Sequence, residues 1–203
     1  MGNKKAPAEE GITGEIYKST FEIFPSYITA LYNGCLRRGV FATRWKRAKL
    51  ITIRKPGKEN SKDISKFHPI SLLNIGRKVL EKVLINRINH HVFSHDLMNN
   101  SQYGSTPQRG TIDTAMVMKN FVEKGLVAQE VTVLVSLDVK GTFDAAWWPS
   151  ILNGLKTCAC PKNLYNLTKS YFSQQTAVLS TNNRMERKVS KGCPQGSCCI
   201  LRF

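Results

Sequence analysis

The amino-acid sequence predicts an α+β fold, because signals for helices and strands are mixed along the chain without regular alternation. Apolar residues recur at every fourth position over Arg77–Phe93, which is the spacing of a buried helix face. Val131–Leu137 is a largely apolar run rich in β-branched residues, and it is too short for a helix, so it predicts a buried strand. Two further β-type runs, 176–181 and 184–189, are joined by two asparagines and predict a hairpin.

The first half of the chain predicts a lead-in, a helix and a strand. Residues 1–19 are polar and predict a loop or a poorly ordered segment. Pro25 suits the first position of a helix, which we expect to end at Gly39. Lys49–Ile53 then predicts a short strand, and the Pro-Gly pair that follows predicts a turn.

The second half predicts three further helices. The first runs from Thr111 to about Leu126, with Thr111 as its N-cap and Asp113 in its first turn, where the helix dipole favours a carboxylate. Apolar spacing predicts the other two around Trp148–Leu155 and Leu164–Tyr171. With 41% hydrophobic residues, these elements can bury a packed core.

Composition limits the classes of protein to which the chain can belong. No stretch of about 18 apolar residues occurs, so a membrane-spanning helix is not predicted. Val40–Ile53 does not form a clean apolar stripe opposite a basic one, so a membrane partner is not predicted either. The N-terminus lacks the apolar segment of a secretory signal, and we expect an intracellular protein. The six cysteines lack the paired spacing of zinc sites, and a chain of this length needs no disulfide framework. A zinc or redox protein is therefore the weakest hypothesis.

Basic residues outnumber acidic ones by 30 to 14, giving a formal net charge of +16. They concentrate in Arg37–Lys58, which holds no acidic residue, and in Lys162–Phe203, which holds only Glu186. Such segments attract polyanions through counterion release, whereas a solvated basic face without a ligand is the plain alternative. The first segment supplies the candidate nucleic-acid-binding residues Arg37, Arg38, Arg44, Lys46, Arg47 and Lys49.

Two short segments carry residues suited to catalysis or binding. Asp138 follows the predicted buried strand, and Mg²⁺ takes one or two protein carboxylates together with substrate phosphates. The structural alternative for Asp138 is to cap the next turn, and Asp144 is either a second ligand or a helix cap. The loop Gly192–Ser197 has two glycines whose backbone can approach a ligand closely, although by itself it predicts only a turn.

Several motifs occur in the order found in one enzyme family. They are Lys4–Pro7, Trp45–Ala48, Lys55–Lys58, Pro69–Leu73, Lys78–Glu81, Gln102–Gly104, Thr106–Thr111, Leu137–Asp144 and Gly192–Ser197. In this order the sequence resembles the reverse transcriptase, an RNA-directed DNA polymerase, of non-LTR (LINE-type) retrotransposons, those of arthropods in particular.

The resemblance implies a right-hand polymerase fold over residues 20–203, with fingers, an incomplete palm and no thumb. It implies RNA-templated DNA synthesis with Mg²⁺ ions, an RNA template, a DNA primer and deoxynucleoside triphosphates, in a nuclear or cytoplasmic ribonucleoprotein. Carried over by position, Asp138 is the catalytic, metal-binding carboxylate. Phe143 is the bulky residue that excludes a 2′-hydroxyl. The implied nucleotide-binding residues are Lys55, Lys58, Phe143, Gln195 and Gly196.

One motif of the family does not occur in this sequence. No Asp or Glu follows Glu186, so the Tyr/Phe-x-Asp-Asp motif that supplies the other palm carboxylates is missing. We therefore expect a truncated copy that is inactive as a polymerase on its own. The alternative function is a non-catalytic, basic remnant that binds RNA or DNA through Arg37–Lys58.

Overall fold

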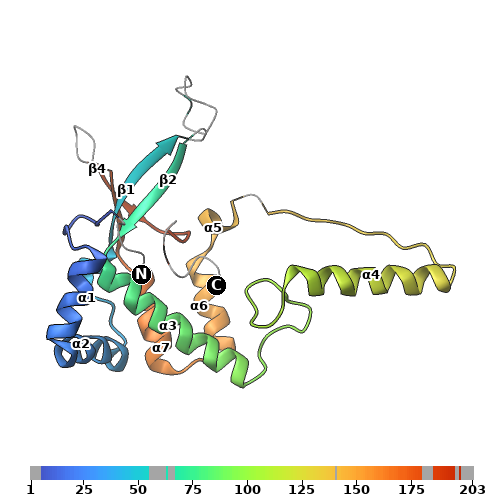
Figure 1. Ribbon diagram of the computed structural model, residues 1–203, viewed down its shortest axis with the longest axis horizontal. Coiled ribbons are helices and arrows are strands. Elements are labelled where there is room, and N and C mark those ends of the chain that lie inside the picture. Colours follow the sequence, from blue (N-terminus) through green and yellow to red (C-terminus); the bar gives the residue numbers. More distant parts are fainter. Residues whose placement is uncertain are drawn as a thin grey trace.

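A four-stranded sheet and a group of helices form the body of the molecule, from which a long arm projects (Figure 1). The computed structural model describes residues 6–54, 63, 67–139, 141–179, 185–194 and 197. The predicted mixture of helices and strands is confirmed. Among the described helices, none combines the length and the apolar character needed to cross a membrane.

The sheet consists of two antiparallel hairpins joined by one parallel pairing, in the order β2-β1-β3-β4. β1 (Arg47–Arg54) pairs with β2 (Phe67–Leu73), and β3 (Gln175–Leu179) pairs with β4 (Met185–Val189). β1 and β3 run parallel, so strands far apart in the sequence form the centre of the sheet. The predicted strand at 49–53 and the pairing within the predicted hairpin are confirmed.

β2 is a strand that the sequence did not predict, because Pro69 lies within it. A proline cannot donate a ladder hydrogen bond, which makes it rare in central strands. β2 lies at the edge of the sheet, where Pro69 pairs with Thr52. Among the described strands, only β1 is hydrogen-bonded to β2. The edge position therefore accommodates the proline.

The helices pack below the sheet around α7, which contacts α2, α3 and α6 (Figure 1). The rings of Phe41 and Tyr171 meet edge to face, and Trp148 stacks on Phe172 with ring centroids 5.2 Å apart. These rings join the leucines and isoleucines of α3 in one buried core. The helices are α1 (Gly14–Ile23), α2 (Pro25–Arg38), the 3₁₀ turn η1 (Thr43–Lys46), α3 (Ile75–Ser94), α4 (Thr111–Val127), α5 (Thr142–Ala145), α6 (Trp148–Thr157) and α7 (Lys162–Phe172).

The predicted helices are confirmed, and two details of the prediction are corrected. Residues 1–19 were expected to form a loop, but the helix α1 begins at Gly14, where the Thr13 hydroxyl accepts a hydrogen bond from the Ile16 amide. The N-cap of α4 is Gly110, not Thr111, and the Asp113 carboxylate accepts a 2.6 Å hydrogen bond from the Gly110 amide. Asp113 thus stabilises the first turn, as predicted, from one position further along.

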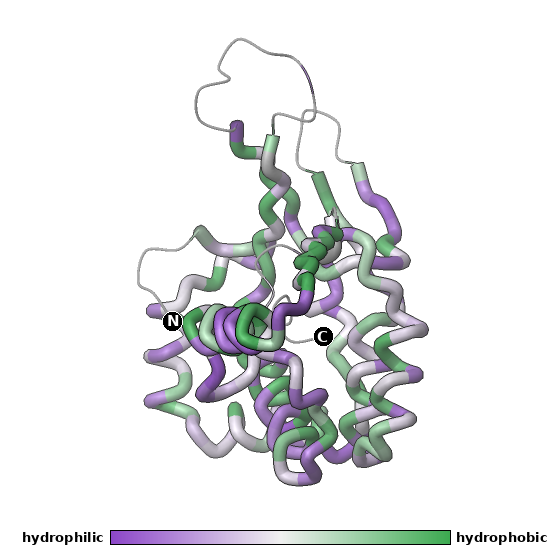
Figure 2. The backbone as a smooth tube through the Cα atoms, turned by 90° about the vertical axis from the view of Figure 1, so that its right-hand side faces the viewer, coloured by the Kyte–Doolittle hydropathy of each residue, from purple (hydrophilic) through white to green (hydrophobic). Residues whose placement is uncertain are grey.

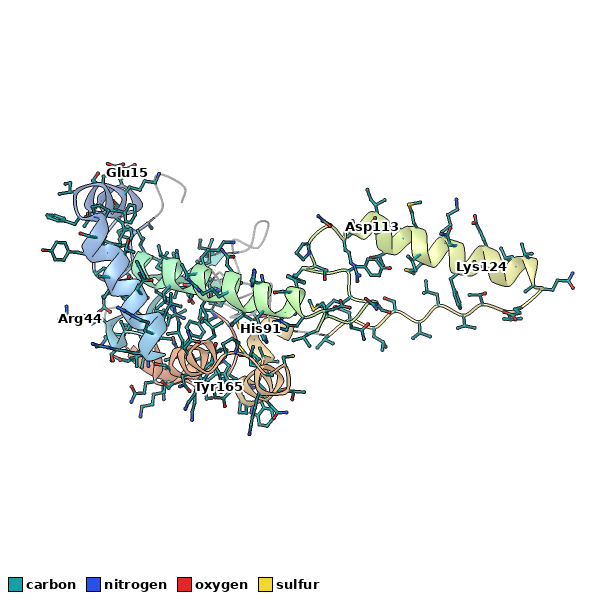
Figure 3. All side chains as sticks on the ribbon, turned by 90° about the horizontal axis from the view of Figure 1, so that it is seen from below. Glu15, Arg44, His91, Asp113, Lys124 and Tyr165 are labelled. Carbon is teal, nitrogen blue, oxygen red and sulfur yellow. The ribbon has the colours of Figure 1, made fainter. Side chains whose placement is uncertain are left out.

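The prediction of a buried strand at Val131–Leu137 is wrong. This segment is extended but exposed, with Val131 and Leu137 at 93% and 88% exposure, and no described strand pairs with it. It returns alongside α4, and the two form the arm (Figures 1 and 3). Figure 2 views the arm end-on and colours the returning segment largely hydrophobic. Apolar, β-branched sequence predicts a strand, but a strand also requires a neighbouring strand for its backbone groups.

Replacing Gly39 with alanine should destabilise the body. Gly39 ends α2 with φ +64°, and an added Cβ would lie 2.6 Å from the Asn166 Cβ. We expect Gly39→Ala to lower the free energy of unfolding by about 2 kcal/mol, from left-handed strain and this clash. Gly34→Ala is the control, because Gly34 lies inside α2 with open space and should gain about 0.5–1 kcal/mol. Urea unfolding measures both, and equal stabilities would contradict the expectation.

Candidate functional site

A cavity of about 230 Å³ lies between the sheet and the loop that follows β4. β1 and β3 form one wall, and Trp148, Tyr171 and Phe172 form another. Most of this lining is apolar. The charged residues at the cavity are Arg77, Asp144 and Lys191.

The loop after β4 packs directly against the chain around α5 and α6. The Gly192 amide donates a 2.7 Å hydrogen bond to the Ala146 carbonyl, and the Trp148 indole N–H donates a 2.8 Å bond to the Gly192 carbonyl. Gly192 has φ +83°, and a Cβ there would lie 2.8 Å from the Asp144 carbonyl oxygen. Only glycine permits this approach. The two segments singled out by sequence, Leu137–Asp144 and Gly192–Ser197, therefore meet at one wall of the cavity.

A ring of buried polar side chains lies beneath this loop; we call it the buried ring. Arg77 and Glu81 are fully buried, and the Arg77 Nε donates to Glu81 Oε1 at 2.7 Å. An Arg77 terminal nitrogen donates to the Tyr171 hydroxyl at 3.1 Å, which lies 3.3 Å from the Ser197 hydroxyl. Ser197 donates to Glu81 Oε2 at 2.9 Å. Four side chains from α3, α7 and the loop thus form a closed set of hydrogen bonds.

Arg77 makes two further bonds that connect the ring to the sheet and to η1. It donates to Gln175 Oε1 at 2.8 Å and to the Trp45 carbonyl at 3.2 Å. Burial opposes the charged form of Arg77, but its electrostatic interactions and hydrogen bonds with Tyr171 and Glu81 prevail and raise its pKa. The guanidinium therefore remains a cation inside the protein.

Cys193 adjoins the buried ring and is itself buried. Burial is the main cause that raises the pKa of its thiol to about 11, and the negative charge of Glu81 adds to the effect while Arg77 opposes it. The thiol is therefore neutral at physiological pH and ill-suited to act as a nucleophile or metal ligand. Among the described residues, Cys35, Cys158 and Cys160 are free thiols as well.

Asp138 lies in the exposed arm and does not line the cavity. The expectation that a buried strand supports it is wrong, because that strand is absent from the described residues. Asp144 lies within α5 and faces the cavity, so it does not cap a helix starting at Ala145. Within the described ranges, no group of three or more His, Cys, Asp or Glu side chains is placed to hold a metal. The separate carboxylates still match Mg²⁺, which takes one or two carboxylates together with phosphate oxygens.

Several predicted nucleotide-binding residues lie outside the described residues. They are Lys55, Lys58, Gln195 and Gly196. The backbone of Phe143 lies in α5, next to the contact with Gly192, but its side chain is outside the described part.

The six basic candidates do not share one environment. Arg37, Arg38 and Arg44 are exposed, and Arg44 lies on the side of the body away from the arm (Figure 3). Lys46, in contrast, is buried and donates a 3.0 Å hydrogen bond to the Ser173 hydroxyl, so it does not belong to the exposed basic surface. Burial also lowers its pKa.

The remaining two candidates, Arg47 and Lys49, lie on β1 and are half-buried. Arg47 forms ion pairs with Glu9 at 3.3 Å and with Glu186 at 3.1 Å, so much of its charge is already balanced. The exposed members of the six candidates are therefore Arg37, Arg38 and Arg44, which we call the arginine group.

Sequence reasoning missed Arg77 and Glu81 as members of the site. A usable signal existed, because both lie on the helix face defined by Leu80, Leu84 and Ile88. Oppositely charged residues four positions apart on an apolar face are expected to pair when buried. Their link to Ser197 joins positions 116 residues apart and is visible only in the folded chain.

Comparisons with known proteins agree with the motif order. Residues 53–199 match the family described as reverse transcriptase (RNA-dependent DNA polymerase). A 115 kDa protein in the type-1 retrotransposable element R1DM of Drosophila melanogaster is 30% identical over 97% of this chain and 19% of its own length. The RNA-directed DNA polymerase from the mobile element jockey of the same species is 28% identical over 96% of the chain and 21% of its length. The chain thus spans about a fifth of the length of these relatives.

The stability of the protein should depend on the Cys193 thiol at high pH. Its folded-state pKa of about 11 exceeds the ordinary value of 9.0, so the stabilisation is present below pH 9 and is lost as pH rises toward 11. Between pH 8 and 11, wild type should lose roughly 2 kcal/mol more than Cys193→Ala. Urea unfolding at both pH values measures this difference, since the lysines and tyrosines titrate in both chains. Parallel losses would show that the thiol contributes nothing.

Proposed function

The chain belongs to the reverse transcriptase (RNA-dependent DNA polymerase) family, and its relatives include proteins of non-LTR retrotransposons. We propose that it forms the nucleotide-binding part of such a polymerase. The observation that carries the proposal is the packing of Gly192 against Asp144 and Ala146. This contact brings together the segment Leu137–Asp144, which carries the carboxylates, and the loop Gly192–Ser197, which we call the glycine loop. The family resemblance assigns the first segment to metal binding and the second to nucleotide binding. In the polymerase fold, this part corresponds to fingers and part of the palm.

The proposed reaction is in-line attack of a primer 3′-hydroxyl on the α-phosphate of a deoxynucleoside triphosphate, directed by an RNA template. When bound, Mg²⁺ would neutralise charge that develops on the phosphate oxygens. Asp138 is the proposed ligand to this cation, and Asp144 lies six residues away at the cavity. Lys191 also lines the cavity, while Lys55 and Lys58, one and four residues after the end of β1 in the sequence, are the proposed cations for the triphosphate.

Discrimination between nucleotides is assigned to residues on either side of the Gly192 contact. Phe143 is the proposed steric block against a 2′-hydroxyl, because a bulky side chain at one position separates ribose from deoxyribose. Gln195 and Gly196, three and four residues after Gly192, are proposed to contact the incoming nucleotide and the template. Because its substrates are RNA and nucleotides, we place the protein in nuclear or cytoplasmic ribonucleoprotein.

A second candidate function is nucleic-acid binding without catalysis. The arginine group favours it, since these three exposed cations lie within eight positions of sequence and the chain carries a net charge of +16. Such a surface binds phosphate backbones with little preference for sequence. This function needs neither Asp138 nor Mg²⁺, so the two candidates predict different responses to metal removal.

Asp138→Asn should weaken Mg²⁺-dependent nucleotide binding at least tenfold, because an amide is a much weaker ligand for a hard cation. The measurement is equilibrium binding of a deoxynucleoside triphosphate to the chain with an RNA–DNA primer–template, in Mg²⁺ and in EDTA. Asp96→Asn is the control, since Asp96 is exposed and its φ of 50° suits asparagine. Equal affinity of wild type and Asp138→Asn, or binding that survives EDTA, would reject the catalytic proposal.

The triple variant Arg37→Ala, Arg38→Ala, Arg44→Ala should bind an RNA–DNA duplex more weakly. It should also lower the slope of log affinity against log salt by about 2–3, close to one for each phosphate that an arginine no longer neutralises. The control variant replaces the exposed Lys119, Lys124 and Lys156 by alanine and removes the same total charge. If both triple variants behave alike, binding depends on net charge and the arginine group is not an interface.

A further inference from the structure

We propose that the buried ring positions the loop Gly192–Ser197, which makes Glu81 and Arg77 positioning residues for nucleotide binding. Neither residue is assigned to touch nucleotide, metal or template. Their effect reaches the site through the Ser197 hydroxyl. The nucleotide part of this inference rests on the proposed function, whereas the anchoring of the loop stands on the contacts alone.

The loop is held at both of its ends. At its start, the Gly192 amide and carbonyl bond to Ala146 and Trp148 at 2.7 and 2.8 Å. At its end, the Ser197 hydroxyl bonds to Glu81 at 2.9 Å, and the Ser197 amide donates to the Pro194 carbonyl at 2.9 Å. The two residues proposed to contact nucleotide, Gln195 and Gly196, lie between these anchors in the sequence. Both described ends of the loop are therefore attached to the body, Gly192 to the chain around α5 and α6 and Ser197 to α3.

The hydrogen bonds of the ring have only one consistent direction. A guanidinium can only donate, so Tyr171 accepts from Arg77 and uses its own hydrogen toward Ser197. Ser197 then donates its hydrogen to Glu81 Oε2, while Arg77 donates to Glu81 Oε1. The two oxygens of one carboxylate are thus divided between the helix and the loop. Replacing either oxygen by a donor group removes one of these charge-assisted hydrogen bonds and changes the direction of the others.

The ion pair is better explained by this positioning than by stability. The free energy needed to remove a guanidinium and a carboxylate from water offsets much of their Coulombic attraction. Proteins in which apolar residues replace such a pair are therefore often as stable. A buried carboxylate that accepts from a loop hydroxyl, in contrast, fixes that hydroxyl with a charge-assisted hydrogen bond. Glu81 lies on the rigid helix α3 inside the core, so it supplies a fixed point to which the end of the loop is attached.

Two substitutions separate the positioning role from the core. Ser197→Ala removes the loop's bond and leaves the Arg77–Glu81 pair inside the core. Glu81→Gln keeps the shape but offers one oxygen and one N–H₂ group, so it cannot accept from both Arg77 and Ser197. If Glu81 acts through Ser197, the double variant should bind nucleotide no more weakly than Glu81→Gln alone.

The test measures binding of fluorescent dATP with Mg²⁺ to the full chain, well below the unfolding temperature. We expect Ser197→Ala and Glu81→Gln each to weaken affinity about tenfold, with non-additive effects in the double variant. Ser197→Thr, which retains the hydroxyl, should return affinity to within about threefold of wild type. Ser94→Ala is the matched control, because Ser94 is an exposed hydroxyl at the end of α3. Additive effects, or no effect of Ser197→Ala, would overturn the inference.

Amide hydrogen exchange of the free protein separates this inference from the proposed function. Ser197→Ala should speed exchange in the segment 191–197 at least threefold and leave α3 unchanged. If wild type binds no nucleotide but exchange still accelerates, the proposed function fails and the anchoring holds. If exchange in the loop is unchanged, the anchoring fails whether or not nucleotide binds.

Discussion

The buried guanidinium of Arg77 is the constraint on which the arrangement of the site depends. A cation inside a protein must find partners for its N–H groups, and Arg77 finds them on η1, α3, α7 and the start of β3. Each partner must be held within hydrogen-bond distance at once. The ion therefore couples the helical core to the sheet, and small shifts of one element are costly for the others.

The same constraint determines the chemistry around the cavity. The aromatic rings of α7 and Trp148 close one side of it, and the Tyr171 ring also lies 5.0 Å from the Arg77 guanidinium. The apolar surroundings keep Cys193 neutral, so the loop next to it offers backbone groups rather than a reactive side chain. Asp144 and Lys191, which are exposed, line the cavity together with the buried Arg77. A mainly apolar lining with a few charged groups is typical of sites for small ligands, such as the proposed nucleotide.

Local patterns predicted local structure well, and long-range contacts account for what they missed. Proline at the start and glycine at the end define α2, and a repeated apolar position defines α3, because both signals act within a few residues. The prediction of a strand at Val131–Leu137 was wrong because a strand needs a neighbouring strand to pair with. The sequence of the segment itself does not specify that neighbour. The burial of Lys46 has a related cause: its charge predicts exposure, yet the side chain is buried and its ammonium donates to the Ser173 hydroxyl.

The division between arm and body shows how the two halves of the site depend on one another. Asp138 belongs to the exposed arm, whereas Asp144 belongs to α5, six residues further along the chain. The bond from the Gly192 amide to the Ala146 carbonyl fixes the body end of this connection. A carboxylate on an extended segment can hold a cation in place only if the base of that segment is fixed. The glycine loop therefore contributes to both proposed binding functions. It adjoins the proposed nucleotide region, and its bond to Ala146 restrains the end of the segment that carries the proposed metal ligand.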